Sequence, residues 1–142
     1  MTEVVKNMMH IAIVEDMAFD RKVLKDCLAE YARKNKAEFH FTEFTDGAQL
    51  LAHYPEKLDL VFMDIMMGEM DGLTAARRLR RKDTEVLLVF VTSMVQYAVQ
   101  GYSVDAMDFL VKALSQNSLN GYREATPLSF KLVVEKGSRI RL

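Results

Sequence analysis

The stretch LDLVFMD, residues 58–64, decides the fold class, because a nearly unbroken apolar run ends on an acid. A run of this kind predicts a strand that is buried on both faces, as in a parallel sheet between two layers of helices. The stretch Glu38–Phe44 instead alternates apolar and polar residues, as a half-exposed strand does. In all, strands are predicted at Met8–Val14, Glu38–Phe44, Leu58–Met63, Val86–Val91 and Ala106–Val111.

Helical patterns fill the gaps between these strands. Apolar residues recur at helical spacing from Phe19 to Lys34, where Cys27 is interpreted as a small core residue. Further helices are predicted from Gly47 to about Tyr54 with Asp46 as the cap, from Asp71 or Gly72 to Lys82, from Met94 to Gln100 and from Ser115 to Ala125. Alternating strands and helices predict a doubly wound α/β domain: a five-stranded parallel sheet with helices on both faces.

Composition limits the classes of function. The chain has 142 residues with a formal net charge of −1, which gives no electrostatic argument for nucleic-acid binding. The basic run Arg77–Lys82 is interpreted as a solvated helix end. One cysteine excludes an intrachain disulfide. No apolar run approaches the roughly 20 residues that span a bilayer, and no signal peptide is evident, so we expect a cytoplasmic protein without a membrane partner.

Polar residues stand where the predicted strands end. Glu15 and Asp16 follow the first strand, and Asp64 follows the third. Thr92 with Ser93 ends the fourth, and Lys112 ends the fifth. Because ligands in doubly wound sheets bind beyond the carboxyl ends of the strands, we expect these side chains to converge there.

Clustered carboxylates repel one another unless a cation lies among them. Hard oxygen ligands suit Mg²⁺, and no histidine or cysteine stands near these acids in the sequence. We therefore expect Asp16 and Asp64 to bind Mg²⁺ directly, Glu15 to bind it directly or through water, and the backbone carbonyl of Met66 to supply a further ligand.

With the metal bound, Asp64 can act as a nucleophile toward a phosphoryl group. Lys112 would neutralise charge on the phosphoryl oxygens, and the Thr92 hydroxyl would donate a hydrogen bond to one of them. Drawing these two side chains inward would move the ends of the fourth and fifth strands, and with them the helix between. The sequence thus predicts a switch operated by one covalent charge.

The motifs resemble those of a known family, the CheY-like receiver domains of response regulators, over residues 9–126. The matching segments are IVED at Ile13–Asp16, VFMDIMMGEMDG at Val61–Gly72, VTS at Val91–Ser93 and FLVK at Phe109–Lys112. The resemblance implies a flavodoxin-like sheet of order 2-1-3-4-5 and phosphotransfer with Mg²⁺ from a sensor histidine kinase to Asp64. It also implies self-catalysed chemistry in place of a conventional enzyme activity, and a switching aromatic at Phe109.

A finer resemblance concerns the C-terminal part. The segment 96–112 is similar to receivers that precede LytTR-type DNA-binding domains, and 127–142 resembles the opening strands of such a domain. This implies that transcription is controlled through an output domain mostly absent from the chain, and that DNA binds only through it. We expect residues 1–8 to be a loose leader. The C-terminal stub, residues 127–142, has a hairpin pattern at 130–134 and 139–142. We expect it to be disordered, or to pair as an added strand with another sheet edge or another chain. Homodimers are expected through the face of the fourth and fifth strands or through the C-terminal strands.

One departure from the family pattern affects Lys112. The family has proline after the lysine, often following a cis peptide bond, whereas Ala113 stands here. A cis bond before a residue other than proline costs about 3–4 kcal/mol. Either the Lys112–Ala113 peptide bond is trans and the Lys112 side chain points in a somewhat different direction, or the bond is cis and the surrounding structure accommodates the strain.

The sequence is compatible with other classes of function. A stand-alone receiver would relay phosphate or bind a protein without any role in transcription. A pseudo-receiver would lack an essential acid, and none is lost. Hydrolases of the haloacid-dehalogenase type also use an aspartate nucleophile, but they usually carry DxD after the first strand, where this chain has Glu15 and Asp16. Dinucleotide, P-loop and zincin motifs do not occur.

Overall fold

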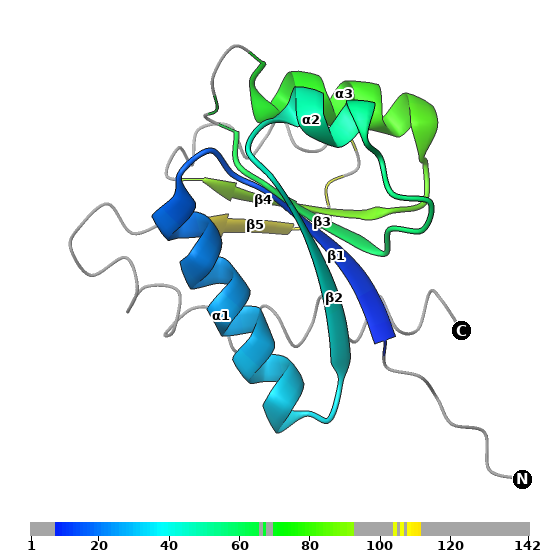
Figure 1. Cartoon of the computed structure of the whole chain (residues 1–142). Helices are drawn as coiled ribbons and strands as arrows, with labels where there is room; N and C mark the ends of the chain where they lie inside the picture. The colour runs from blue at the N-terminus through cyan, green and yellow to red at the C-terminus, as the bar shows by residue number, and fades with distance from the viewer. Residues whose placement is uncertain are drawn as a thin grey trace, which may run out of the picture.

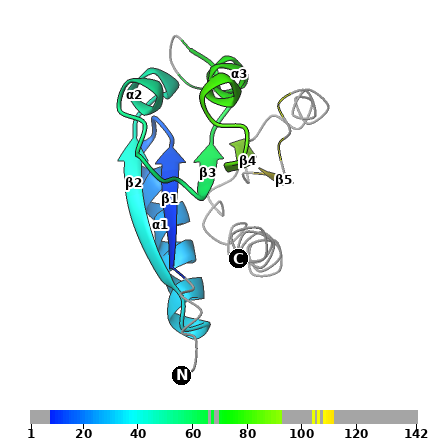
Figure 2. The ribbon, with the colours of Figure 1, turned by 90° about the vertical axis from the view of Figure 1, so that its right-hand side faces the viewer.

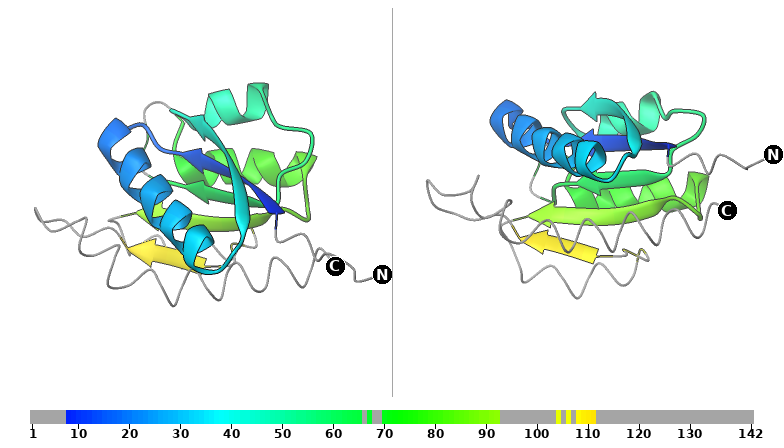
Figure 3. Two further views of the ribbon diagram at one scale, coloured as in Figure 1. Left: turned by 60° about the horizontal axis from the view of Figure 1, so that its bottom comes forward. Right: turned by 90° about the horizontal axis from the view of Figure 1, so that it is seen from below.

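The sheet is parallel, with strand order β2-β1-β3-β4-β5, as predicted. The computed structural model describes residues 8–65, 67, 70–92, 104, 106 and 108–111. Figure 2 shows the arrowheads of β2, β1 and β3 pointing the same way, and Figure 3 shows β5 beside β4 at the edge. The strands are β1 Met8–Val14, β2 Glu38–Phe44, β3 Leu60–Met63, β4 Leu87–Thr92 and β5 Asp108–Val111.

The strand bounds match the prediction for β1 and β2 and differ elsewhere. The third strand begins at Leu60, two residues after the predicted start. Leu58 and Leu60 are buried in the cores on opposite faces of the sheet, whereas residues two apart in a strand face the same side. The chain therefore has no strand geometry at Leu58. The fourth strand is shifted by one residue and includes Thr92, and the fifth begins at Asp108 instead of Ala106.

Helices cover both faces of the sheet, as predicted (Figure 1). Helix α1, Ala18–Lys34, starts one residue before the predicted position. Helices α2, Gly47–Ala52, and α3, Gly72–Lys82, are capped by carboxylates: Asp46 accepts from the Gln49 N–H at 2.8 Å, and Asp71 from the Thr74 N–H at 2.7 Å. Helix α2 ends two residues before the predicted Tyr54.

Two hydrophobic cores lie on the two faces of the sheet. The alternating side chains of each central strand divide between them, which explains why β1 and β3 are apolar throughout. On the α1 side the buried residues are Met9, Ile11, Ile13, Val23, Leu24, Leu28, Leu60, Phe62, Val89 and Val91. On the α2 and α3 side they include Ala12, Val14, Leu50, Val61, Met63, Leu73, Ala76, Leu79, Leu88 and Phe90. Cys27 is half-buried and packs against the first of these cores.

Several predictions fall outside the described residues. These are the helices at 94–100 and 115–125, the C-terminal hairpin, the peptide bond after Lys112 and most of the leader. Met8, assigned to the leader, is the first residue of β1. Within the described ranges, no helix has both the length and the apolar character required to cross a bilayer.

Candidate metal and phosphoacceptor site

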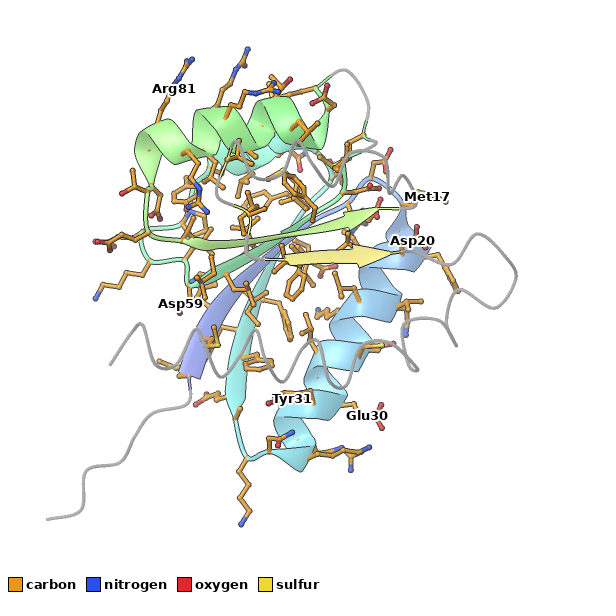
Figure 4. All side chains as sticks on the ribbon, turned by 180° about the vertical axis from the view of Figure 1, so that it is seen from behind. Met17, Asp20, Glu30, Tyr31, Asp59 and Arg81 are labelled. Atoms are coloured by element: carbon orange, nitrogen blue, oxygen red, sulfur yellow. The ribbon has the colours of Figure 1, made fainter. Side chains whose placement is uncertain are left out.

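Three carboxylates meet at the carboxyl end of the sheet, as predicted. Glu15 and Asp16 follow β1 and Asp64 follows β3, and one oxygen from each lies within 4.8 Å of the others. Glu15 and Asp64 are buried, at 4% and 6% exposure, whereas Asp16 is exposed. In Figure 4, Met17 and Asp20 mark this end of the molecule, toward which the β4 arrowhead points; Asp59 marks the opposite end.

The two buried acids are held by backbone hydrogen bonds that continue the strand ladders. The Asp64 N–H donates to the Val14 carbonyl at 3.0 Å, and the Glu15 N–H donates to the Phe44 carbonyl at 3.0 Å. Three neighbouring strands, β2, β1 and β3, thus fix the backbone from which the carboxylates project. The register of the sheet, set by its apolar residues, is what brings these acids together.

A cationic side chain fixes the turn that follows Glu15. The Arg21 Nη1 donates to the Glu15 carbonyl at 2.7 Å, and the Met17 N–H donates to the Glu15 carboxylate at 3.2 Å. The guanidinium also lies 3.6 Å from Glu43 of β2, whose other oxygen is 3.2 Å from the Lys25 ammonium. No role was predicted for Arg21 from the sequence. A cation one turn into the helix that follows the acidic pair was the available signal.

Glycine at position 72 lets α3 approach the Asp64 backbone. The Gly72 N–H donates to the Ile65 carbonyl at 2.8 Å. A Cβ at this position would overlap the Asp64 carbonyl oxygen and lie 2.8 Å from the Ile65 Cα. Both are backbone atoms and have little freedom to move aside. The start of α3 and the end of β3 therefore pack directly against each other, and this contact requires glycine at position 72. Gly72 is the last residue of the family-like motif Val61–Gly72, and this close packing explains why a glycine stands there.

The donor set fits a hard divalent cation. Ligands on one Mg²⁺ lie at most about 4.2 Å apart, twice the usual bond length of about 2.1 Å. Small rotations of the three side chains would bring their oxygens from within 4.8 Å to that range. Carboxylate oxygens are the ligands that Mg²⁺ prefers, and two acids this deeply buried beside a third favour a bound cation.

The remaining predicted residues are described only in part. Thr92 is the last residue of β4, and its backbone pairs with Val111 of β5. Phe109 pairs with Phe90 in the same ladder. Lys112 follows Val111 in sequence, and it lies, like Met66, outside the described residues. The roles of these four residues therefore stay predictions.

An open parallel sheet with an acidic, metal-competent cluster beyond its central strands defines a class of phosphoryl-handling α/β domains. The response regulator receiver domain model matches residues 11–122, and the chain belongs to that family. Domains of this family are signalling modules of two-component response regulators that accept a phosphoryl group.

Individual relatives agree with this assignment. The chain is 38% identical to the chemotaxis protein CheY of Bacillus subtilis over 72% of this chain and 83% of that protein. It is 29% identical to the sensory transduction protein LytR of Streptococcus agalactiae, over 79% of this chain but 45% of that protein. The chain thus spans less than half of LytR.

Solved structures share the fold. The response regulator domain of Thermotoga maritima CheB superposes with a TM-score of 0.73 at 25% identity, over 93% of this chain and 97% of that one. The response regulator TrrA of the same organism, solved in complex with Mg²⁺-BeF, gives a TM-score of 0.65 at 23% identity, over 82% and 97% of the two chains.

Proposed function

We propose that this chain is a phosphorylation switch in which Asp64 accepts a phosphoryl group from the phosphohistidine of a sensor histidine kinase. The observation that carries the proposal is the cluster of three carboxylates from two strands, each with an oxygen within 4.8 Å of the others. Asp64 is the member that lies at the centre of the sheet edge, after the middle strand of five. The solved TrrA complex contains Mg²⁺ and BeF, which supports a metal-dependent site of this kind in the family.

The chemistry follows from the carboxylate cluster. An oxygen of Asp64 attacks phosphorus, the P–N bond of the donor breaks, and the histidine ring nitrogen takes the electron pair. The product is an aspartyl phosphate. Glu15, Asp16, Asp64 and the Met66 carbonyl would hold Mg²⁺, which would neutralise charge on the phosphoryl oxygens when bound. The backbone hydrogen bond from Asp64 to Val14 keeps the nucleophile in place during the transfer.

Three residues at or near the ends of β4 and β5 would respond to the negative charge of the phosphoryl group on Asp64. We assign hydrogen bonding to a phosphoryl oxygen to Thr92, charge neutralisation to Lys112 and a coupled side-chain rotation to Phe109. The pairing of Thr92 with Val111 supports this, because it joins the two strand ends that such contacts would pull on. The altered face of these strands is then the proposed surface for homodimer formation.

In the whole protein we propose that residues 9–126 form the receiver and 127–142 begin a LytTR-type DNA-binding domain. Relatives named LytR and LytT, and the transcriptional regulatory protein YpdB of Escherichia coli, support this, since the chain covers about 45% of each. The likeness to CheY over 83% of that protein supports the alternative, a stand-alone receiver. A gene that continues past Leu142 into basic, strand-rich sequence would favour the transcription regulator.

A phosphodonor assay tests the central proposal. Wild type and Asp64→Asn are incubated with Mg²⁺ and acetyl phosphate, and the intact mass is measured. We expect the mass of one phosphoryl group on wild type and none on the variant, because an amide cannot form the acyl phosphate. Asp59→Asn is the matched control, and it should be labelled like wild type. Equal labelling of Asp64→Asn and wild type would remove Asp64 from this role.

A further inference from the structure

The exposed acid of the cluster has no hydrogen bond or ion pair of its own within the described part of the chain. Glu15 and Asp64 are buried, and each has additional interactions. Asp16 is exposed, and no partner for its carboxylate occurs among the described side chains. Its position relative to the other two acids therefore depends on the backbone that carries it.

A side chain of α1 holds that backbone at the carbonyl of Glu15. The peptide between Glu15 and Asp16 sets the direction in which the Asp16 side chain leaves the chain, and the carbonyl of this peptide accepts from Arg21 Nη1 at 2.7 Å. Glu43 lies 3.6 Å from the Arg21 Nε, and Lys25 lies 3.2 Å from Glu43. The Arg21 side chain is only 18% exposed, so its guanidinium is confined between β2 and the turn.

We propose that Arg21 is a positioning residue of the metal site, which fixes the Glu15–Asp16 peptide and so orients the Asp16 carboxylate toward the ion. The inference rests on the proposed function, since it assigns the same three carboxylates to Mg²⁺. Outer residues that orient metal ligands typically change affinity by about 10–100-fold when they are replaced. Arg21 donates to the backbone carbonyl of Glu15, so it would act through the backbone and not as a ligand.

A purely electrostatic role for Arg21 predicts the opposite result. A guanidinium near a cation site repels the incoming Mg²⁺, so removal of its charge should tighten binding. If Arg21 instead positions the Glu15–Asp16 peptide, its removal should weaken Mg²⁺ binding. The Asp16 carboxylate would then lose conformational freedom when the ion binds, and this loss would lower the affinity. The sign of the change in Kd therefore separates the two roles.

The test is a Mg²⁺ titration of the thermal unfolding midpoint, which yields a Kd without any measurement of phosphorylation. We expect Arg21→Gln to raise the Kd for Mg²⁺ about tenfold. Lys22→Gln is the matched control: it removes one cation from the same helix, where Lys22 is exposed and pairs with Asp26. We expect its Kd to equal that of wild type or to be slightly lower.

A second variant covers the case in which Arg21→Gln fails to fold, which its metal-free melting curve would reveal. Arg21→Lys keeps the charge and one donor for the Glu15 carbonyl but loses the fork that also reaches Glu43. We expect it to bind Mg²⁺ about two- to fivefold more weakly than wild type. Binding as tight as wild type, or tighter, in Arg21→Gln or in Arg21→Lys would overturn the positioning role.

Failure of the proposed function would look different. If Mg²⁺ did not raise the unfolding midpoint of wild type, the metal site itself would be wrong. If wild type responded and Asp16→Asn did not, the site would stand, and the Arg21 variants alone would decide the inference.

Discussion

Two aspartates flank the central strand, and the difference between them shows how a structural acid differs from a functional one. Asp59 precedes β3 and Asp64 follows it. The Asp59 carboxylate accepts from the His10 N–H at 2.8 Å, while its backbone bonds to the carbonyl of His10 and the N–H of Leu87. It completes the sheet at its amino end. Asp64 is the more deeply buried of the two and faces two further carboxylates.

Burial beside other negative charges, and not burial alone, distinguishes the functional acid Asp64 from the structural acid Asp59. A half-buried carboxylate that accepts from a backbone N–H stabilises the fold, because a charge-assisted hydrogen bond offsets its desolvation. Three carboxylates gathered at one strand edge repel one another and favour a structure that binds a cation. The acidic cluster therefore costs stability in the metal-free chain, and a bound ion would restore it.

The largest effect is expected where α3 meets the backbone of Asp64. Gly72→Ala should lower the free energy of unfolding by about 3 kcal/mol, because the added methyl group meets backbone atoms of Asp64 and Ile65. Urea unfolding followed by circular dichroism measures this. Thr74→Ala, in the same first turn but half-exposed, is the control and should change stability by less than about 1 kcal/mol. A Gly72→Ala protein as stable as wild type would show that the close approach is unimportant.

Much of this architecture follows from the sequence. The bounds of β1 and β2 were predicted correctly because their apolar patterns end at charged or small polar residues, and the acids at 15, 16 and 64 converge once the parallel order is known. The predicted start of β3 was wrong because Leu58 is apolar, as a strand residue would be. A strand through Leu58 would place its side chain in the same core as Leu60, but Leu58 packs in the core on the other face of the sheet. The Arg21 bond to the Glu15 carbonyl was not predicted, because a backbone acceptor leaves no mark in the sequence; the available signal was the cation itself, one turn into the helix that follows the acidic pair.

The same substitution at both flanking aspartates tests the comparison directly. In the absence of metal, Asp64→Asn should raise the free energy of unfolding by about 1–2 kcal/mol, since it removes one of three clustered negative charges. Asp59→Asn should lower it by about 0.5–1 kcal/mol, because a neutral acceptor bonds the His10 N–H less strongly than a carboxylate does. Parallel chemical denaturation of the two variants in EDTA is the measurement. Changes of the same sign would contradict the distinction between the two ends of β3.

Another acid, Asp71, stands at the same end of the sheet but serves as a helix cap. Asp71 accepts from the Thr74 N–H at 2.7 Å and is exposed. Asp71→Ala should lower the free energy of unfolding by about 1 kcal/mol, the usual cost of losing a cap. The Kd for Mg²⁺, measured by thermal titration, should stay within about twofold of wild type, since long-range attraction from an exposed charge is weak in water. A tenfold loss of Mg²⁺ affinity would mean that Asp71 belongs to the ion site, and that the site extends beyond the acids that follow β1 and β3.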